Sequence, residues 1–187
     1  NVVELEMSEN KVEDISFLPN MKQLDYLYMP DCKNVKEWSP LSQCSVITGL
    51  CIRGCNLSDI SFLSGLVKLN NVDVSNNNLN DMTPLSSSYN TIETLVLSNN
   101  IFKDISAVTN MKNIKTLTVE ENLLETLPDM TSLSNLEYIN VRNNYLTLTD
   151  EEFAALLPTK VTSSEDWINT TNIHVQNTDN TNNENNN

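Results

Sequence analysis

The residues that most often carry catalysis are nearly absent from this chain. Among its 187 residues there is one histidine, His174, and there are three glycines, Gly49, Gly54 and Gly65. Proton transfer commonly uses histidine, and a phosphate-binding loop needs several glycines close together. The sequence therefore contains no glycine-rich loop, no Cys–His–Asp spacing and no histidine-based metal motif.

Two pairs of adjacent glutamates, Glu120-Glu121 and Glu151-Glu152, are the remaining candidates for acid–base chemistry. Neighbouring residues on a strand point to opposite faces, which separates the first pair. The second pair lies at the expected start of a helix, where acidic residues are ordinary. We therefore expect no catalytic residues, no cofactor and no metal site, and we interpret this segment as not being an enzyme.

Basic residues are also scarce. Eleven Lys and Arg oppose 25 Asp and Glu, which gives a formal net charge of −14. Repulsion from phosphate makes nucleic acid and an anionic membrane surface poor partners. No run of about 18 apolar residues occurs, so we expect no membrane insertion within this segment. A basic patch on a protein partner is compatible with the charge, and the simpler interpretation is an acidic surface that keeps the chain soluble.

A regular interval dominates what the sequence does contain. An Asn or Cys anchor recurs every 22 or 23 positions, each time closing a short hydrophobic alternation, at Asn10, Cys32, Cys55, Asn77, Asn100, Asn122 and Asn144. Self-similarity at such a period indicates a repeat array. The units are residues 2–23, 24–46, 47–68, 69–91, 92–113 and 114–135, with an incomplete seventh from 136.

Each unit contains one short strand with a buried face. The pattern is L-x-x-L-x-L-x-x-[NC]-x-L, as in Leu69, Val72, Val74, Asn77 and Leu79, and its alternation is typical of a half-buried strand. The expected inward pairs are Leu5/Met7, Leu27/Met29, Leu50/Ile52, Val72/Val74, Leu95/Leu97, Leu117/Val119 and Ile139/Val141. Because one such strand is not stable alone, neighbouring units must stack into a parallel sheet.

These motifs resemble the leucine-rich repeat family over about residues 2–157. A second signature recurs as Asp14-Ile15-Ser16, Asp59-Ile60-Ser61, Asp81-Met82-Thr83 and Asp104-Ile105-Ser106. With this triplet the pattern looks like the 22-residue repeat of the bacterial internalins. The resemblance implies an α/β solenoid: a horseshoe with short parallel strands on its concave face, 3-10 or short helical turns on its convex side, and a C-terminal helical cap.

The triplet also predicts how the outer turns begin. Its Ser or Thr is expected to cap a short helical turn. Pro40 and Pro84 suit the first helical position, because the amide proton that proline lacks would be unpaired there. The sixth unit has Thr126-Leu127-Pro128 instead, so we expect its outer turn to differ.

The chain divides into a repeat array over residues 1–148, a helical cap over 149–160, and an Asn-rich, mostly flexible tail or linker over 161–187. Thr149 can cap the helix, and Pro158 ends it. From Asn177 onward seven of eleven residues are Asn and none is apolar, a composition that cannot bury enough surface to become ordered. Because residue 1 lies inside a repeat without a polar first cap, we expect it to be a processed end or the edge of a longer chain.

The four cysteines are expected to be core thiols. Cys32 and Cys55 occupy anchor positions, Cys44 lies in an outer apolar segment, and Cys51 should point out from the sheet. Adjacent strands lie about 4.8 Å apart, so the spacing permits a Cys32–Cys55 disulfide, although free thiols are the usual state of buried cysteine. An exposed, free Cys51 would favour a reducing compartment.

The exposed face of the sheet is where we expect the function to lie. Seven strands give a face about 30 Å long, enough for an interface of about 800 Å² per partner. Tyrosine suits such a surface because its large ring carries a polar tip, although tyrosine is also common in strands that bind nothing. The candidate partner-binding residues are Glu4, Glu6, Tyr26, Tyr28, Arg53, Asp73, Tyr138 and Arg142.

We therefore predict a non-catalytic protein-recognition domain, a monomer that binds a partner protein through its concave face. The internalin resemblance implies a bacterial cell-surface or secreted protein. A first alternative is a cytoplasmic scaffold or enzyme-regulatory subunit, which four free thiols would suit. A second alternative is a targeting arm for an enzyme encoded outside this segment.

Overall fold

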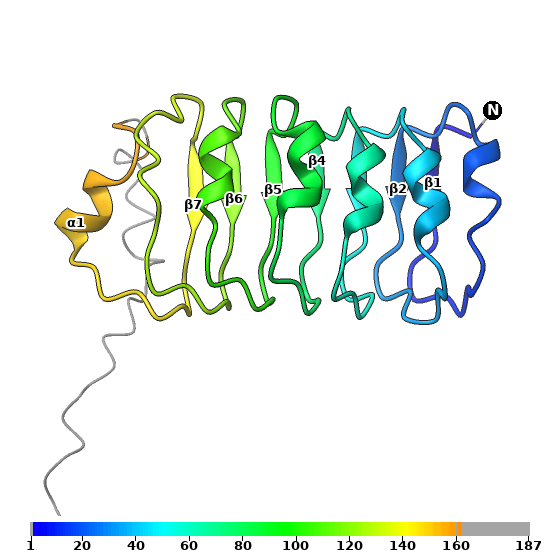
Figure 1. Cartoon of the computed structure of the whole chain (residues 1–187), viewed down its shortest axis with the longest axis horizontal. Coiled ribbons are helices and arrows are strands. Elements are labelled where there is room, and N and C mark those ends of the chain that lie inside the picture. The colour runs from blue at the N-terminus through cyan, green and yellow to red at the C-terminus, as the bar shows by residue number, and fades with distance from the viewer. Residues whose placement is uncertain (1, 160, 162–187) are drawn as a thin grey trace, which may run out of the picture.

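Short parallel strands form the one sheet that runs through the whole array. The structure, a computed structural model, describes residues 2–159 and 161. Within these residues one seven-stranded sheet runs in sequential order from β1 to β7. Figure 1 shows the strands side by side along the longest axis, a row of coiled turns along one side of the sheet, and α1 at the C-terminal end. This arrangement confirms the predicted solenoid.

Strands and turns alternate along the chain. The strands are β1 (Glu4–Glu6), β2 (Tyr26–Tyr28), β3 (Gly49–Cys51), β4 (Asn71–Asp73), β5 (Thr94–Val96), β6 (Thr116–Thr118) and β7 (Tyr138–Asn140). The 3-10 helices are η1 (Leu18–Asn20), η2 (Ser39–Gln43), η3 (Ser61–Gly65), η4 (Thr83–Ser88) and η5 (Ser106–Asn110), and the α-helix is α1 (Asp150–Ala155). Each unit thus supplies one strand, and most supply one outer turn.

The strands pair so that equivalent positions of successive units lie side by side. The central residues form one row: Leu5, Leu27, Leu50, Val72, Leu95, Leu117 and Ile139. All of the predicted inward pairs from β2 to β7 are buried. Leu5 and Met7 are only half-buried, because β1 has a neighbouring strand on one side only.

The asparagine anchors connect each unit to the one before it. Asn100 Nδ2 donates to the carbonyl oxygens of Leu97 in its own unit, at 2.9 Å, and of Val74 in the preceding unit, at 3.1 Å. Its Oδ1 accepts from the amide of Leu79, also in the preceding unit, at 2.9 Å. Asn122 repeats this arrangement. Since unpaired buried backbone groups are costly, these amides hold the inner turns together.

Cysteine fills the anchor position with weaker bonds. The Cys55 thiol donates to the Met29 carbonyl oxygen at 3.1 Å, and the Cys32 thiol donates to that of Met7 at 2.8 Å. A thiol is a weak donor and a weak acceptor, so these units lack the strong acceptor that an asparagine offers. All four cysteines of the chain are buried and free, and Cys32 and Cys55 do not form the disulfide that their spacing permitted.

The outer turns begin differently from the prediction. Ser61 is the first residue of η3, and its amide and Oγ donate to Asp59 Oδ1 and Oδ2 at 3.1 and 2.6 Å. The N-cap residue is Ile60, which makes no side-chain cap bond. The aspartate two residues ahead therefore supplies the acceptor, as in an Asx turn, and the predicted Ser cap is wrong. Pro40 and Pro84 take the second position of η2 and η4 rather than the first.

The outer turn of the sixth unit differs, as expected. Among the described residues no 3-10 helix lies between β6 and β7. The aspartate turn is nevertheless present farther along, where the amide and Oγ1 of Thr131 donate to Asp129 Oδ1 at 2.9 and 2.6 Å. The sequence prediction overlooked this turn, because Asp129 lies farther from its anchor residue than the corresponding aspartates do in the other units.

A short helix closes the C-terminal end of the array. Thr149 caps α1 by accepting from the amide of Glu152 at 3.2 Å, while the Glu152 carboxylate accepts from the amide of Thr149 at 2.9 Å. Phe153 and Leu157 are buried in the common core. The helix is shorter than the predicted cap over 149–160. His174 and the predicted tail beyond Val161 lie outside the described residues.

We expect Asn100→Ala to lower the free energy of unfolding by about 3 kcal/mol, because several buried backbone groups lose their partners at once. The measurement is urea unfolding followed by circular dichroism. Asn78→Ala is the matched control, because this asparagine is exposed and the same substitution there should change stability by less than about 0.5 kcal/mol. Equal effects of the two substitutions would contradict the anchoring role.

Candidate functional site

Strand register brings five of the eight predicted site residues together. Glu4 lies beside Tyr26, and Glu6 lies beside Tyr28. Tyr28 in turn pairs with Cys51, which pairs with Asp73. Neighbouring strands are about 4.8 Å apart, so these side chains share one stretch of the concave face. Arg53 follows β3 two residues after Cys51 and is exposed.

Tyr138 and Arg142 lie at the other end of the sheet. Tyr138 is on β7, five strands away from Tyr26, which corresponds to about 24 Å at the usual strand spacing. Tyr138 and Tyr26 have similar exposed fractions, 40% and 38%. The predicted residues therefore form two separate groups, and the larger one lies on β1 to β4.

The ring of Tyr26 occupies space that is open only because residue 49 is a glycine. A Cβ added at Gly49, which pairs with Tyr26 in the next strand, would lie 2.0 Å from Tyr26 Cδ2 and 2.1 Å from Cε2. The ring therefore lies across the glycine, in space that any other residue would fill. Glycine within a strand often marks such a close approach. The sequence contained this signal, but the sequence prediction gave Gly49 no role.

A recess opens beside the two tyrosines on the concave face. It has a volume of about 210 Å³, and its lining comes from β2 to β5: Tyr26, Tyr28, Leu50, Cys51, Asn71, Val72, Asp73, Thr94 and Val96. Three of the predicted residues, Tyr26, Tyr28 and Asp73, are among them. Sequence reasoning did not select the rest of the lining as site residues, because alternation predicts the direction of a side chain but not the hollow between its neighbours.

Cys51 occupies the floor of this recess rather than an exposed surface. Its side chain is on the concave side, as predicted, but its exposed fraction is only 3%. The thiol donates to Asp73 Oδ2 at 3.6 Å. Burial raises the pKa of Cys51 to about 11, and the Asp73 carboxylate adds to the shift. The premise of an exposed Cys51, which would have favoured a reducing compartment, is therefore wrong.

Negative charge predominates around the recess. The outward positions of the first four units carry three carboxylates, Glu4, Glu6 and Asp73, and one cation, Arg53, a balance of −2. None of the ion pairs in the described part of the chain involves these three carboxylates. Burial raises the pKa of Tyr26, and nearby Cys51, Glu4, Tyr28 and Asp73 raise it further.

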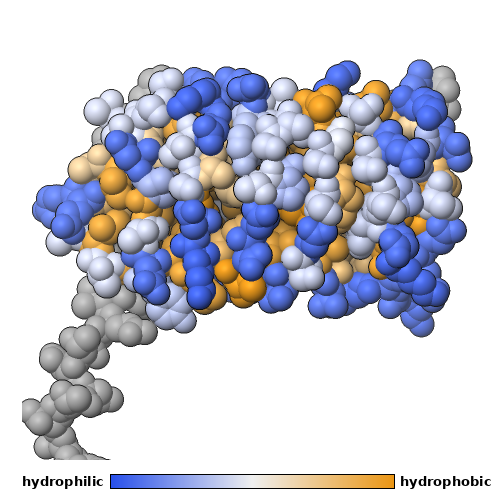
Figure 2. Space-filling view, in the orientation of Figure 1, coloured by the Kyte–Doolittle hydropathy of each residue, from blue (hydrophilic) through white to orange (hydrophobic). Residues whose placement is uncertain are grey.

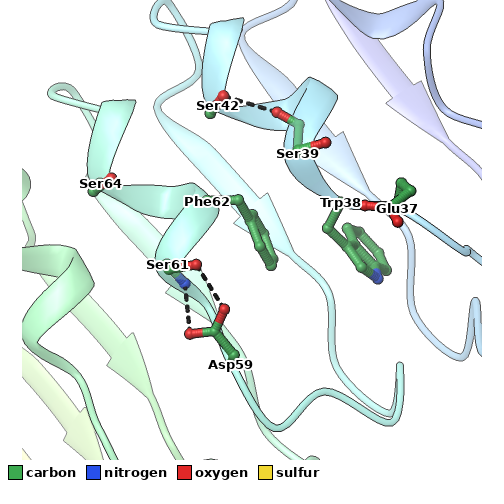
Figure 3. A pocket seen from close by; sticks show the side chains of 8 residues that line it. All are labelled: Glu37, Trp38, Ser39, Ser42, Asp59, Ser61, Phe62 and Ser64. Atoms are coloured by element: carbon green, nitrogen blue, oxygen red, sulfur yellow. Dashed lines mark hydrogen bonds between the residues drawn. The ribbon is translucent and has the colours of Figure 1, made fainter.

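A second, larger hollow lies on the convex side between η2 and η3. It has a volume of about 480 Å³ and is lined by two aromatic residues, four serines and two carboxylates: Trp38, Phe62, Ser39, Ser42, Ser61, Ser64, Glu37 and Asp59. Figure 3 shows the rings of Trp38 and Phe62 facing each other along the array. Their centroids are 5.7 Å apart and their planes differ by 18°. This stacked pair joins the outer sides of two adjacent units.

The convex side has mixed polarity. Figure 2, in the orientation of Figure 1, shows apolar surface exposed between polar side chains. In residues 2–159 and 161, no three His, Cys, Asp or Glu side chains converge as they would around a metal ion. No helix of the described part is long and apolar enough to cross a membrane.

The solved structures that share this architecture include two internalins. Internalin C2 from Listeria monocytogenes superposes with a TM-score of 0.73 at 24% sequence identity, covering 82% of this chain and 67% of that chain. The fold is the leucine-rich repeat solenoid of the internalins. Internalin F from the same organism superposes with a TM-score of 0.60 at 20% identity, covering 82% of this chain and 51% of that chain. No protein-family model and no curated protein matches the sequence.

The likeness to internalins supports the predicted fold but not the predicted site. At these identities the shared property is the architecture, and the chain spans about half the length of internalin F. The internalin-type array nevertheless has a defined concave face, so its candidate residues can be placed and tested one at a time.

We expect Cys51 in the folded array to react slowly with 5,5′-dithiobis(2-nitrobenzoate). A thiol pKa of about 11 instead of 9.0 leaves about 100-fold less thiolate near neutral pH, and burial slows access further. Unfolding in urea should make all four cysteines reactive. The measurement is the reaction rate by absorbance in the wild type and in Cys51→Ser. Rapid labelling of Cys51 in the folded protein would contradict its burial.

Proposed function

We propose that this internalin-type array is a non-catalytic protein-recognition domain whose concave face binds a partner protein. The observation that carries the proposal is the recess beside Tyr26 and Tyr28, which combines exposed aromatic surface with the Asp73 carboxylate, a group that forms no ion pair among the described residues. Tyrosine is enriched at the centres of interfaces, because it buries much area and keeps a polar tip.

The shape of the face supports a protein partner. A face about 30 Å long, with strands about 4.8 Å apart, matches an interface of standard size. The strands present their outward side chains in rows, so a partner can contact several units at once. The recess supplies the aromatic anchor, while the small polar residues Thr94, Thr116 and Thr118 allow close approach over the middle of the face.

We further propose that the protein acts at a bacterial cell surface or after secretion, as the internalin resemblance implies. The four thiols no longer favour a cytoplasmic location, because all of them are buried and would be unreactive in either compartment. The cytoplasmic scaffold and the targeting arm of a separate enzyme are the competing proposals, and the identity of the captured partner separates them.

The combined substitution Tyr26→Ala and Tyr28→Ala should weaken partner binding at least about 30-fold, equivalent to about 2 kcal/mol, as the loss of two central aromatic residues would. The tagged chain is first used to capture proteins from surface extracts and from cytosolic lysate. The captured protein is then identified by mass spectrometry, purified, and titrated against both forms by calorimetry.

Tyr145→Ala is the matched control, because Tyr145 is 50% exposed and lies outside the strands. It should leave affinity unchanged, and thermal unfolding should be nearly the same in all three proteins. If the double variant binds as tightly as the wild type, the concave site is wrong. An extracellular partner supports surface recognition, whereas a cytosolic enzyme supports the regulatory scaffold.

A further inference from the structure

We infer that the recess beside Tyr26 receives a lysine or arginine side chain of the partner protein. This inference rests on the proposed function, because it names the chemistry that the same concave site would recognise. It follows from the size of the recess, the ring that forms one wall and the charge of the surrounding groups.

The recess is sized for one side chain. Its volume of about 210 Å³ is below the range of about 300–1,000 Å³ typical of sites for drug-sized ligands. It corresponds to roughly seven water molecules at about 30 Å³ each, which is comparable to the atoms of one long side chain. The half-buried side chain of Val96 and the ring of Tyr26 can cover the methylene groups of such a side chain.

An aromatic ring and a carboxylate stand on opposite sides of this space. Tyr26 belongs to β2 and Asp73 to β4, and both line the recess, with the strand β3 between them. The ring lies against Gly49, in space that a side chain at position 49 would fill, and it lines the recess. A cation over an aromatic face is attracted to it when it lies within about 6 Å of the ring centre.

Asp73 is fixed in position and has no ion-pair partner among the described residues. Its Oδ1 accepts from the amide and Oγ of Ser75, at 3.0 and 2.6 Å, and its Oδ2 accepts the weak thiol bond from Cys51. These donors are neutral, so the negative charge is not cancelled. A guanidinium or ammonium group is the complement of a carboxylate beside an aromatic ring.

Charge complementarity selects a cation over other side chains. The outward charges of the first four units sum to −2, from Glu4, Glu6 and Asp73 against Arg53. The whole chain carries −14, so a basic partner segment is attracted from a distance. An acidic side chain entering the same recess would meet repulsion from every nearby carboxylate, and a neutral one would gain no charge interaction.

A peptide pair tests this inference without the partner. The full chain, labelled with ¹⁵N, is titrated with N-acetyl-Gly-Arg-Gly-amide and with the citrulline peptide, which has nearly the same shape but no charge. We expect the arginine peptide to shift amide resonances of β2, β3 and β4 and to bind about 10-fold more tightly than the citrulline peptide, the scale of one cation–π contact with an ion pair. A lysine peptide should behave like the arginine peptide.

Two variants test the geometry of the recess. Tyr26→Leu removes the ring, and Gly49→Ala should displace it, because the added Cβ would overlap the ring carbons. Each should lower affinity for the arginine peptide about 5-fold, the scale of one cation–π contact, while Tyr145→Leu should leave it unchanged. Thermal unfolding of each variant shows whether it is folded, and Tyr26→Leu remains informative if Gly49→Ala does not fold.

Several outcomes would overturn the inference. These are equal binding of the citrulline and arginine peptides, resonance shifts spread over the whole acidic surface, and unchanged binding in Tyr26→Leu. Failure here is distinguishable from failure of the proposed function. If a captured partner depends on Tyr26 and Tyr28 while the arginine peptide does not bind, concave recognition stands and the cationic side chain is wrong.

Discussion

Lateral pairing between consecutive units is the constraint on which the remaining structure depends. A three-residue strand has no hydrogen-bond partner within its own unit, so its amides and carbonyls must pair with the next strand. The anchors repeat this dependence at the inner turn, where Asn100 bonds to backbone groups of both its own and the preceding unit. No unit is complete alone, and the array therefore behaves as one body with a continuous core.

Fixed register has a direct consequence for the concave face. Because β2, β3 and β4 pair residue by residue, side chains at equal positions form straight rows about 4.8 Å apart. A recess arises where one row contains residues of very different size. Tyr26 beside Gly49 is such a place, since the ring extends over the neighbouring strand and leaves a hollow next to it. The relief of the concave face thus depends on differences in side-chain size between neighbouring units.

Several features were predictable because they follow from periodicity and local chemistry. The interval of the anchors predicted the parallel sheet and its inward pairs, and Thr149 predicted the start of α1. The outer turns were predicted incorrectly, because Asp59 and Ser61 can both form local hydrogen bonds and the sequence does not show which one supplies the acceptor. Asp129 was overlooked because the connection before it is irregular.

The repeating pattern of the chain was sufficient to establish the solenoid, the order of its strands and the face to which each strand residue points, since direction follows from alternation. Only the folded arrangement decided which outward residues are covered. Cys51 points to the concave side yet is buried, and Tyr138 shares the face with Tyr26 yet lies at its far end. The physical reason is that coverage depends on the sizes and contacts of side chains in adjacent units, which lie more than 20 residues apart in the chain.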